Sequence, residues 1–548
     1  MAELVLGPLL RYVDETRATI FVETDAFTAV TVRIGEHDWT APTFAAHGHH
    51  YAIVLVDGLQ PASVQEYSVD LDDRRVWPEA DSSFPPSRIA TLDPDKDASF
   101  LFGSCRTSVS HDKQGNDLHG VDALRAYAYE MARNPDHWPD FVLFLGDQLY
   151  ADETSAAMRD FIERRRGLDE PPGEEVKDFV EYAELYRLAW TDPANRWLLS
   201  TLSSAMIFDD HDVRDDWNTS ASWHEAMNAT PWWHDRIVGA LGSYWIYQHA
   251  GNVDHDTLAQ DQIWKIIAAH QDSTELDLTT LIDRFAEQVD SDPTTYRFSF
   301  VRELGGTRLV VIDSRAARDL RPAHRAMLDA DELAWVDEQL QGDTEHLFIG
   351  TSLPFLLPTG IHDLESLNET MAQSGKRITG ALGEKIRQAV DLEHWAAFEK
   401  SFRDVSRMVF EVARGERGRA PATITFLSGD VHNSYVNEVT ATPMPVESRI
   451  VQAVCSPIRN PLPRHVRMLQ GTLSGWMGAP MRSLVNRMPK VKKPEFDWAT
   501  THGPWFDNNL ARVEVLGSRL LLTWARGDVE GDNYDDPKLV RVETVLID

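Results

Sequence analysis

Four apolar segments of the sequence end in side chains that bind metal ions in many proteins. The segments are SFLFGSC (99–105), FVLFLGD (141–147), SAMIFDD (204–210) and TITFLSGD (423–430). The candidate ligands that they and the loops after them supply are Cys105, Asp147, Tyr150, Asp209, Asp210, His211, Asp212, Asp430 and His432. Because sites in open α/β sheets form at the carboxyl ends of strands, we expect these side chains to converge on metal ions.

The residue types indicate which ions such a site would hold. Carboxylate oxygens suit hard divalent or trivalent cations, and a carboxylate shared by two ions is the usual bridge of a two-metal site. Asp147 stands where such a bridge is needed. Tyr150 and Cys105 are poor ligands for Mg²⁺, but a ferric ion is acidic enough to deprotonate a phenol whose ordinary pKa is about 10. The residues alone therefore predict two metals, one of them ferric, with Asp147 between them and Tyr150 on one.

The segment DDHD (209–212) gives the sharpest single signal. Its four titratable side chains follow one strand and repel one another unless cations or protons neutralise them. Taken singly, Cys105 and Tyr150 have an ordinary explanation as packed side chains. A disulfide between Cys105 and Cys455, the two cysteines of the chain, also stays open.

Strands and helices alternate from residue 98 to residue 548, which predicts an α/β fold with a buried sheet. Further apolar strands are expected at 308–314, 345–352 and 448–456, and a hairpin at 512–527. Helices are expected at 154–166, 178–201 and 392–415.

Residues 1–95 have a different pattern, in which apolar and polar residues alternate with a period of two. This pattern predicts a small β-sandwich, and GLQPASVQEYSV (58–69) is similar to part of a fibronectin-III-like module. The proline-rich segment 77–95 is typical of a linker. We therefore expect an N-terminal domain at 1–95 and a catalytic domain at 98–548.

Composition excludes some classes of protein. The chain has 548 residues and a formal net charge of −34, which argues against nucleic acid as a general ligand. It shows no run of about 18 apolar residues, so we expect no transmembrane segment. Neither a basic-then-apolar leader nor a twin arginine is seen near the start, and the expected location is cytoplasmic. The sequence leaves the oligomeric state open.

Segment 457–494 departs from the acidic trend, because it carries Arg and Lys but no Asp or Glu. The favoured interpretation is a cap or lid packed on the acidic body. The alternative is a surface for an anionic substrate or a peripheral contact with membrane lipid.

In their order along the chain, GSC, GDQLYAD, DDHD and SGDVH resemble the PhoD-like alkaline phosphatases of the calcineurin-like metallophosphoesterase superfamily. The resemblance extends over most of residues 98–548. It implies a four-layer α/β/β/α sandwich, preceded by the small all-β domain, that hydrolyses phosphate monoesters or diesters.

The resemblance also implies roles for individual residues. Iron would be bound by Cys105, Asp147, Tyr150 and His432, and calcium by Asp147, Asp210 and Asp430. His211 would be the catalytic histidine. The sequence departs from the family pattern at Asp215 and Asp216, where Asn is frequent, and in 347–355, which has no histidine of the wider superfamily.

The mechanism expected from these assignments is metal-assisted hydrolysis. A hydroxide held by the metal pair attacks phosphorus in line, and His211, oriented by Asp212, stabilises or protonates the leaving oxygen. Arg106 follows the cysteine ligand and either binds a phosphate oxygen or forms a surface salt bridge. The alternatives are a phospholipase-type phosphodiesterase acting on lipid headgroups and a non-catalytic binding protein on the same scaffold.

Overall fold

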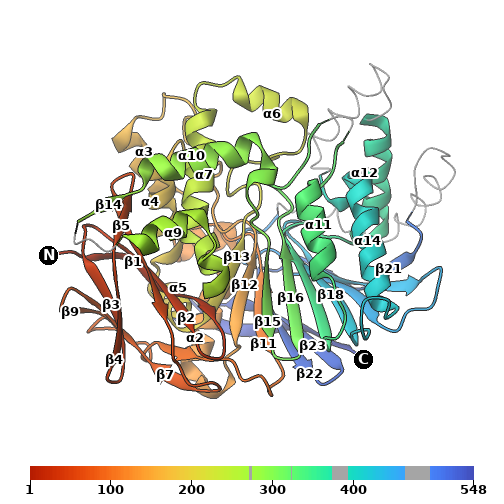
Figure 1. Ribbon diagram of the computed structural model, residues 1–548, viewed down its shortest axis with the longest axis horizontal. Helices are drawn as coiled ribbons and strands as arrows, with labels where there is room; N and C mark the ends of the chain where they lie inside the picture. The colour runs from red at the N-terminus through yellow and green to blue at the C-terminus, as the bar shows by residue number, and fades with distance from the viewer. Residues whose placement is uncertain (271–273, 322–323, 373–392, 463–493) are drawn as a thin grey trace.

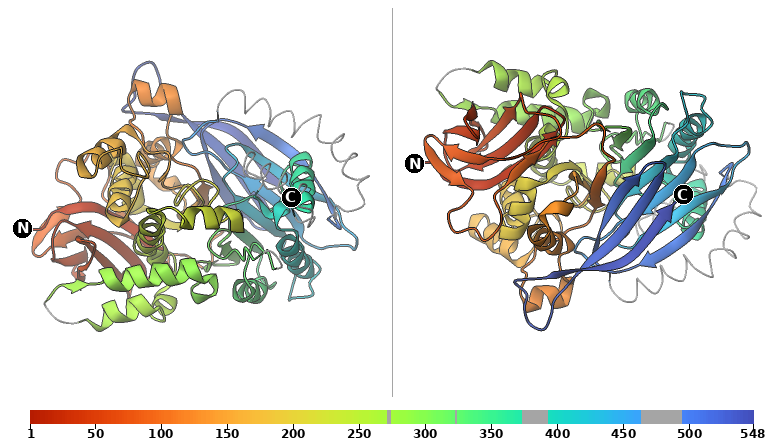
Figure 2. Two further views of the ribbon diagram at one scale, coloured as in Figure 1. Left: turned by 90° about the horizontal axis from the view of Figure 1, so that it is seen from above. Right: turned by 90° about the horizontal axis from the view of Figure 1, so that it is seen from below.

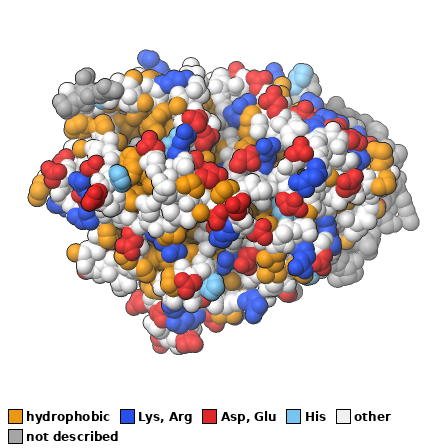
Figure 3. Space-filling view, turned by 60° about the horizontal axis from the view of Figure 1, so that its bottom comes forward, with side chains coloured by type: hydrophobic (Ala, Val, Ile, Leu, Met, Phe, Trp, Pro, Cys, Tyr) orange, Lys and Arg blue, Asp and Glu red, His pale blue; other side chains and the backbone are white. Residues whose placement is uncertain are grey.

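The computed structural model describes residues 1–270, 274–321, 324–372, 393–462 and 494–548. Most of segment 457–494 therefore lies outside the described residues, and its expected role as a cap or lipid-binding surface is not addressed by the fold. Within the described ranges, none of the helices combines the length and apolar character needed to cross a bilayer. On the face shown in Figure 3, acidic and basic side chains are intermixed.

The N-terminal region is all-β, as its period of two predicts. Alternate residues such as Ile20, Val22, Val54 and Val56 are buried in a separate apolar core. The strands are β1 (Leu4–Val13), β2 (Ala18–Thr24), β3 (Ala29–Ile34), β4 (His37–Pro42), β5 (Phe44–Ala46), β6 (His49–Val56), β7 (Val64–Glu66), β8 (Ser68–Leu71), β9 (Arg74–Trp77) and β10 (Arg88–Ala90). Together with β14 (Leu276–Asp277) they form a five-stranded sheet in the order β1-β2-β6-β5-β14, a four-stranded sheet in the order β4-β3-β8-β9, and the pair β10-β7.

The N-terminal region is tied closely to the rest of the chain. Strand β14 (Leu276–Asp277) comes from the second part of the sequence and pairs in parallel with β5. The buried guanidinium of Arg11 donates hydrogen bonds to Ser204 Oγ at 3.0 Å and to Asn252 Oδ1 at 3.0 Å. In both views of Figure 2 the first strands and the last strands lie at opposite ends of the molecule.

Two larger sheets form the centre of the molecule (Figure 1). The six-stranded sheet has the order β13 (Ser203–Ile207), β12 (Phe141–Leu145), β11 (Ser99–Gly103), β22 (Asn509–Leu516), β23 (Arg519–Asp528), β24 (Lys538–Ile547). Strands β11, β12 and β13 are parallel, and the last three are antiparallel. The expected hairpin at 512–527 is confirmed as β22 and β23.

The seven-stranded sheet has the order β15 (Phe300–Leu304), β16 (Thr307–Ile312), β17 (His346–Thr351), β18 (Thr423–Ser428), β20 (Arg449–Val454), β19 (Ser434–Ala441), β21 (Asp497–Trp505). Strands β16, β17, β18 and β20 are parallel. The expected strands at 308–314, 345–352 and 448–456 are thus confirmed within one or two residues.

The inner faces of these two sheets pack against each other. Phe100 on β11 meets Phe348 on β17 edge to face, with ring centroids 5.1 Å apart. A Cβ placed on Gly350 would lie 3.3 Å from Leu145 Cδ2. Gly350 on β17 thus lets the side chains of β12 pack closely against the seven-stranded sheet.

Helices cover the outer faces. Helix α2 (Ala123–Arg133) packs on β22 to β24, whereas α11 (Ala330–Gln339) and α14 (Glu399–Ala413) share an apolar core with the seven-stranded sheet. The other α-helices of the described residues are α1 (Lys113–His119), α3 (Ala156–Arg165), α4 (Phe179–Trp190), α5 (Pro193–Thr201), α6 (Ala221–Asn228), α7 (Trp233–Tyr247), α8 (His255–Leu258), α9 (Gln262–Ala269), α10 (Thr279–Ser291) and α12 (Thr359–Ala372).

The helix expected at 178–201 is in fact two helices. Pro193 cannot continue α4, and Asp192 caps the new helix α5 by accepting hydrogen bonds from the amides of Ala194 and Asn195. The helix expected at 154–166 is α3. The helix expected at 392–415 begins only at Glu399, because Trp395–Ala397 forms a short 3₁₀ turn.

Candidate active site

The loops that follow β11, β12 and β18 meet at one place. The amide of Cys105 donates to the carbonyl of Gly146 at 3.2 Å, which joins the loops after β11 and β12. The amide of Asp430 donates to Ser104 Oγ at 3.1 Å, which joins the loop of the other sheet to the first. Side chains that are far apart in sequence are brought together because both sheets place the ends of their parallel strands at the same edge.

Three of the four side chains expected to bind iron form one group. One ligand atom from each of Cys105, Asp147 and His432 lies within 4.8 Å of the other two. Cys105 Sγ is 3.3 Å from Asp147 Oδ2, and the hydroxyl of Tyr150 is 3.4 Å from the same oxygen. Cys105, Asp147 and Tyr150 are buried, whereas His432 is partly exposed. The structure therefore brings the fourth residue, Tyr150, to the same carboxylate.

The pKa values of these side chains are those expected of a group that binds a cation. Burial and the nearby Asp430 raise the pKa of the Cys105 thiol to about 12, and burial together with Cys105 raises the pKa of Asp147 well above its usual value. Burial lowers the pKa of His432 to about 4, so the imidazole is neutral, which is the form that binds metals. Asp147 Oδ1 has no hydrogen-bond partner among the described residues. A cation between these atoms would stabilise the thiolate and carboxylate forms and supply the missing partner.

The backbone of these residues is strained. The φ angles of Cys105, Asp147, Asp430 and His432 are 58°, 50°, 67° and 49°, in the left-handed region that residues other than glycine rarely adopt. Each such residue costs about 1–3 kcal/mol, and such residues are concentrated at functional sites. All four residues lie in the turns that follow β11, β12 and β18.

Gly146 makes room at the end of β12. Its φ angle is 101°, and a Cβ placed there would lie only 2.6 Å from the Cβ of Asp209. Glycine at this position lets the loop after β13 approach the loop after β12, which places Asp209 and Asp210 beside Asp147. One oxygen from each of these three carboxylates lies within 4.8 Å of the other two.

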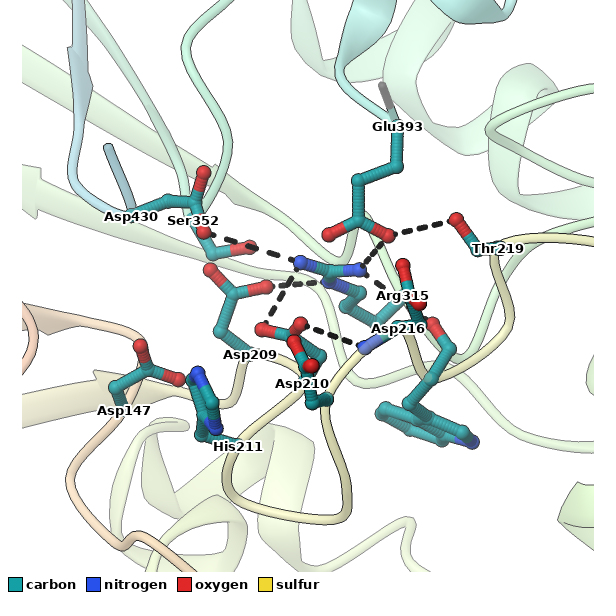
Figure 4. A network of polar contacts seen from close by, with 12 residues as sticks. Asp147, Asp209, Asp210, His211, Asp216, Thr219, Arg315, Ser352, Glu393 and Asp430 are labelled. Carbon is teal, nitrogen blue, oxygen red and sulfur yellow. Dashed lines mark hydrogen bonds and ion pairs between the residues drawn. The ribbon is translucent and has the colours of Figure 1, made fainter. Parts of the chain in front are cut away.

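A buried arginine lies among the acidic side chains (Figure 4). Arg315 follows β16, and its side chain is 0% exposed. It forms an ion pair with Asp209, a second with Asp210 at 3.1 Å, and a third with Glu393 at 2.5 Å. Asp430 Oδ1 lies 4.0 Å from its Nη2 atom.

The three carboxylates expected to bind calcium are divided between two groups. Asp147 groups with Asp209 and Asp210, whereas Asp430 groups with Glu393 and Asp210. Arg315 lies against both Asp210 and Asp430, and His394 Nε2 is 2.8 Å from Asp430 Oδ2. These contacts do not fit a calcium ion on Asp210 and Asp430, because Arg315 is already paired with Asp210 and His394 with Asp430.

His211 lies beside the group formed by Cys105, Asp147 and His432. The carboxylate that orients its ring is not the expected one. Its Nδ1 atom is 2.9 Å from Asp152 Oδ1. Asp212 instead accepts hydrogen bonds from the amides of Asp147, Leu149 and Asp209 at 2.8–2.9 Å. The expectation that Asp212 orients His211 is therefore corrected: Asp212 holds the loop backbones, and Asp152 holds the imidazole.

Arg106 does not face the site. It donates to Asp122 Oδ2 at 2.8 and 3.0 Å and to the carbonyl of Ala189 at 2.8 Å, and it is 2% exposed. Both expectations for Arg106, a phosphate contact and a surface salt bridge, are corrected to a buried ion pair. Cys105 and Cys455 are both free thiols, so the alternative of a disulfide is wrong.

Several residues of the site were missed from the sequence. Arg315 follows the strand of segment 308–314 directly, so the strand-end argument applied to the acidic residues also points to it. Asp152 belongs to the quoted segment GDQLYAD. Glu393 and His394 had no such signal, because they precede a helix and reach the site only through the fold.

The site opens to solvent on one side. The side chains of His211 and Asp430 are 18% and 19% exposed, whereas Asp147 and Cys105 beneath them are buried. A substrate would therefore meet His211 and Asp430 at the surface of the site.

Residues 114–500 match the family described as PhoD-like phosphatase, and residues 1–89 match a domain of unknown function, DUF7800. None of the curated proteins matches the chain.

A solved structure titled "Structure of PhoD" is similar in fold, with a TM-score of 0.58 and 12% sequence identity over 99% of this chain and 90% of that chain. The type III pullulan hydrolase from Thermococcus kodakarensis aligns with 10% identity over the full length of both chains, with a TM-score of only 0.15.

Proposed function

This chain belongs to the PhoD-like phosphatase family, and on that premise we propose that it hydrolyses phosphate esters at the site around Asp147 and His211. The observation that carries this proposal is the convergence of Cys105, Asp147 and His432, with Tyr150 on the same carboxylate, from loops of two different sheets. We extend the proposal to both monoesters and diesters.

We propose iron as the ion held by Cys105, Asp147, Tyr150 and His432. This donor set combines a thiol, a phenol, a carboxylate and an imidazole, which suits a ferric ion better than Mg²⁺ or Ca²⁺. When bound, the ion supplies Lewis acidity and lowers the pKa of water. Arg315 conflicts with the calcium ion expected on Asp147, Asp210 and Asp430, so no step is assigned to it.

His211 is the proposed proton donor to the leaving oxygen. Burial alone lowers its pKa, but the carboxylates of Asp152, Asp210 and Asp147 raise it well above the usual value, so the imidazole carries its proton. Burial raises the pKa of Asp152, but His211 outweighs it and lowers that pKa to about 2, so Asp152 stays ionised. The hydrogen bond from Nδ1 to Asp152 leaves Nε2–H as the donor to the leaving group.

We also infer that the two central sheets and their outer helices form the α/β/β/α sandwich expected for metallophosphoesterases, with domains at 1–95 and 98–548. Residues 93–97 between them are exposed. Limited proteolysis should cut there first. A first cut inside either central sheet would contradict this division.

The test of the proposed function is hydrolysis of p-nitrophenyl phosphate and bis-p-nitrophenyl phosphate by the wild-type protein and two variants. Asp147→Asn should lose most of the activity on both substrates, whereas His211→Ala should lose less of it, because p-nitrophenolate leaves without needing a proton. Circular dichroism should show the fold of both variants unchanged. Asp117→Asn, at an exposed carboxylate of α1, is the control and should keep it. Wild-type rates in both site variants would show that the site is assigned wrongly.

A further inference from the structure

The side chain of Arg315 is held inside the acidic pocket by hydrogen bonds. Its Nη1 atom donates to Glu393 Oε2 at 2.5 Å and to the carbonyl of Trp217 at 3.4 Å. Its own amide donates to Asp313 Oδ1 at 2.8 Å, which fixes the backbone from which the side chain starts. The guanidinium is thus positioned from both ends.

The carboxylate that receives this guanidinium is positioned as well. Thr219 Oγ1 donates to Glu393 Oε2 at 2.9 Å, and Arg318 Nη1 lies 3.5 Å from the same oxygen. Burial raises the pKa of Glu393, but Arg315 and Arg318 outweigh it and lower that pKa to about 2, so the carboxylate is ionised. Figure 4 shows Arg315 between Glu393 on one side and Asp209 and Asp210 on the other.

The charges of the pocket require a cation. A buried carboxylate is costly unless it is paired, and Asp210, Glu393 and Asp430 offer oxygens within 4.8 Å of one another. Calcium would need six to eight oxygens at about 2.3–2.6 Å. The Nη2 atom of Arg315 is already 3.1 Å from Asp210 Oδ1 and 4.0 Å from Asp430 Oδ1. A metal ion and this guanidinium would have to share the same carboxylate oxygens.

We propose that Arg315 is a permanent cation of the pocket formed by Asp210, Glu393 and Asp430, and that it takes the place of a metal ion there. The inference rests on the proposed phosphoesterase site, because it concerns the second half of that site. An arginine stays charged at any physiological pH and is not lost to chelators. The proposed site would therefore combine one metal centre, at Cys105 and Asp147, with the permanent charge of Arg315 beside it.

The test is the number of ions that each purified full-length protein binds, measured by elemental analysis after saturation with calcium and removal of free ions. Arg315→Ala empties the pocket and should bind one more divalent cation per chain than the wild type, with a calcium-dependent rise in Tm. Glu393→Gln removes a carboxylate used only by this pocket and should bind as many ions as the wild type. Arg302→Ala is the matched control, because Arg302 is also buried but bonds to Ser203 and to backbone carbonyls, and it should gain no ion.

The proposal would be overturned if Glu393→Gln bound fewer ions per chain than the wild type. It would also be overturned if Arg315→Ala folded but bound no additional ion. If Arg315→Ala does not fold even with calcium, the comparison of the wild type with Glu393→Gln decides. These counts do not depend on catalysis. A protein without phosphatase activity but with the expected counts would contradict the proposed function alone.

Discussion

His211 Nδ1 lies 2.9 Å from Asp152 Oδ1, although Asp212 is its neighbour in sequence. Asp152 comes from the loop after β12, and the carbonyl of His211 accepts a hydrogen bond from the amide of Ala151 in the same loop at 2.9 Å. The imidazole and its carboxylate are thus fixed to each other by both side chain and backbone. The structure thus identifies Asp152, and not Asp212, as the partner of His211, which the sequence alone does not reveal.

We expect Asp152→Asn to impair proton donation by His211. The loss in kcat should reach about 10²-fold for an alkyl phosphate, whose leaving group needs a proton, and should be smaller for p-nitrophenyl phosphate. Steady-state kinetics on both substrates measure the difference. Equal losses on the two substrates would contradict a role in leaving-group protonation.

Asp212→Asn should act differently, because Asp212 accepts three backbone hydrogen bonds. Weakening them should lower the free energy of unfolding by about 1–3 kcal/mol. The ratio of rates on the two substrates should stay near that of the wild type. Urea unfolding monitored by circular dichroism measures the first quantity, and a variant as stable as the wild type would contradict this role of Asp212.

The proposed iron site predicts colour. A tyrosinate or thiolate bound to Fe³⁺ should give visible absorption, which Tyr150→Phe should shift and Cys105→Ser should weaken together with iron content. Cys455→Ser is the matched control, because the Cys455 thiol is also buried but bonds to Asn509. Loss of colour in Cys455→Ser, or an unchanged spectrum in both site variants, would contradict the assignment.

Gly146→Ala tests the close approach of the loops after β12 and β13. The substitution forces alanine into the left-handed φ region, which should lower the free energy of unfolding by about 1 kcal/mol. The new Cβ also lies 2.6 Å from Asp209, and this overlap should lower it by about 1–3 kcal/mol more. Gly35→Ala has a φ angle of 59° but no atom within 4 Å of the new Cβ, so it should show only the first cost. Thermal unfolding compares the two, and equal losses would contradict the steric argument.

Stability should depend on pH through Glu332 on α11. Burial raises the pKa of Glu332 from 4.5 to about 8, so the folded protein binds a proton that the unfolded chain releases. The free energy of unfolding should therefore fall as the pH rises from about 4.5 through 8, by about 1.4 kcal/mol per pH unit at most.

Glu332→Gln should make the free energy of unfolding fall less steeply between pH 6 and pH 8. Part of the slope should remain, because burial also raises the pKa of Asp212 to about 7 and that of Asp313 to about 6. Urea unfolding at pH 6, 7 and 8 measures the effect. A variant with the same slope as the wild type over this range would show that Glu332 is not the group responsible.

The strand ends were predictable because a buried strand must be apolar and stops where polar residues begin. This pattern located Cys105, Asp147, Asp210 and Asp430 before any coordinates were known. It did not reveal which neighbours pair, since the partner of His211 depends on how two loops cross. For the same reason the sequence could not predict that Glu393 belongs to the site, because its position depends on the packing of Arg315 and Thr219.

The claim on which the rest depends is that Cys105, Asp147, Tyr150 and His432 bind one iron ion. Anomalous X-ray diffraction from crystals of the purified protein, recorded on both sides of the iron absorption edge, tests it most directly. We expect one strong iron peak within bonding distance of all four side chains. An active protein with no iron peak among these residues would contradict the claim.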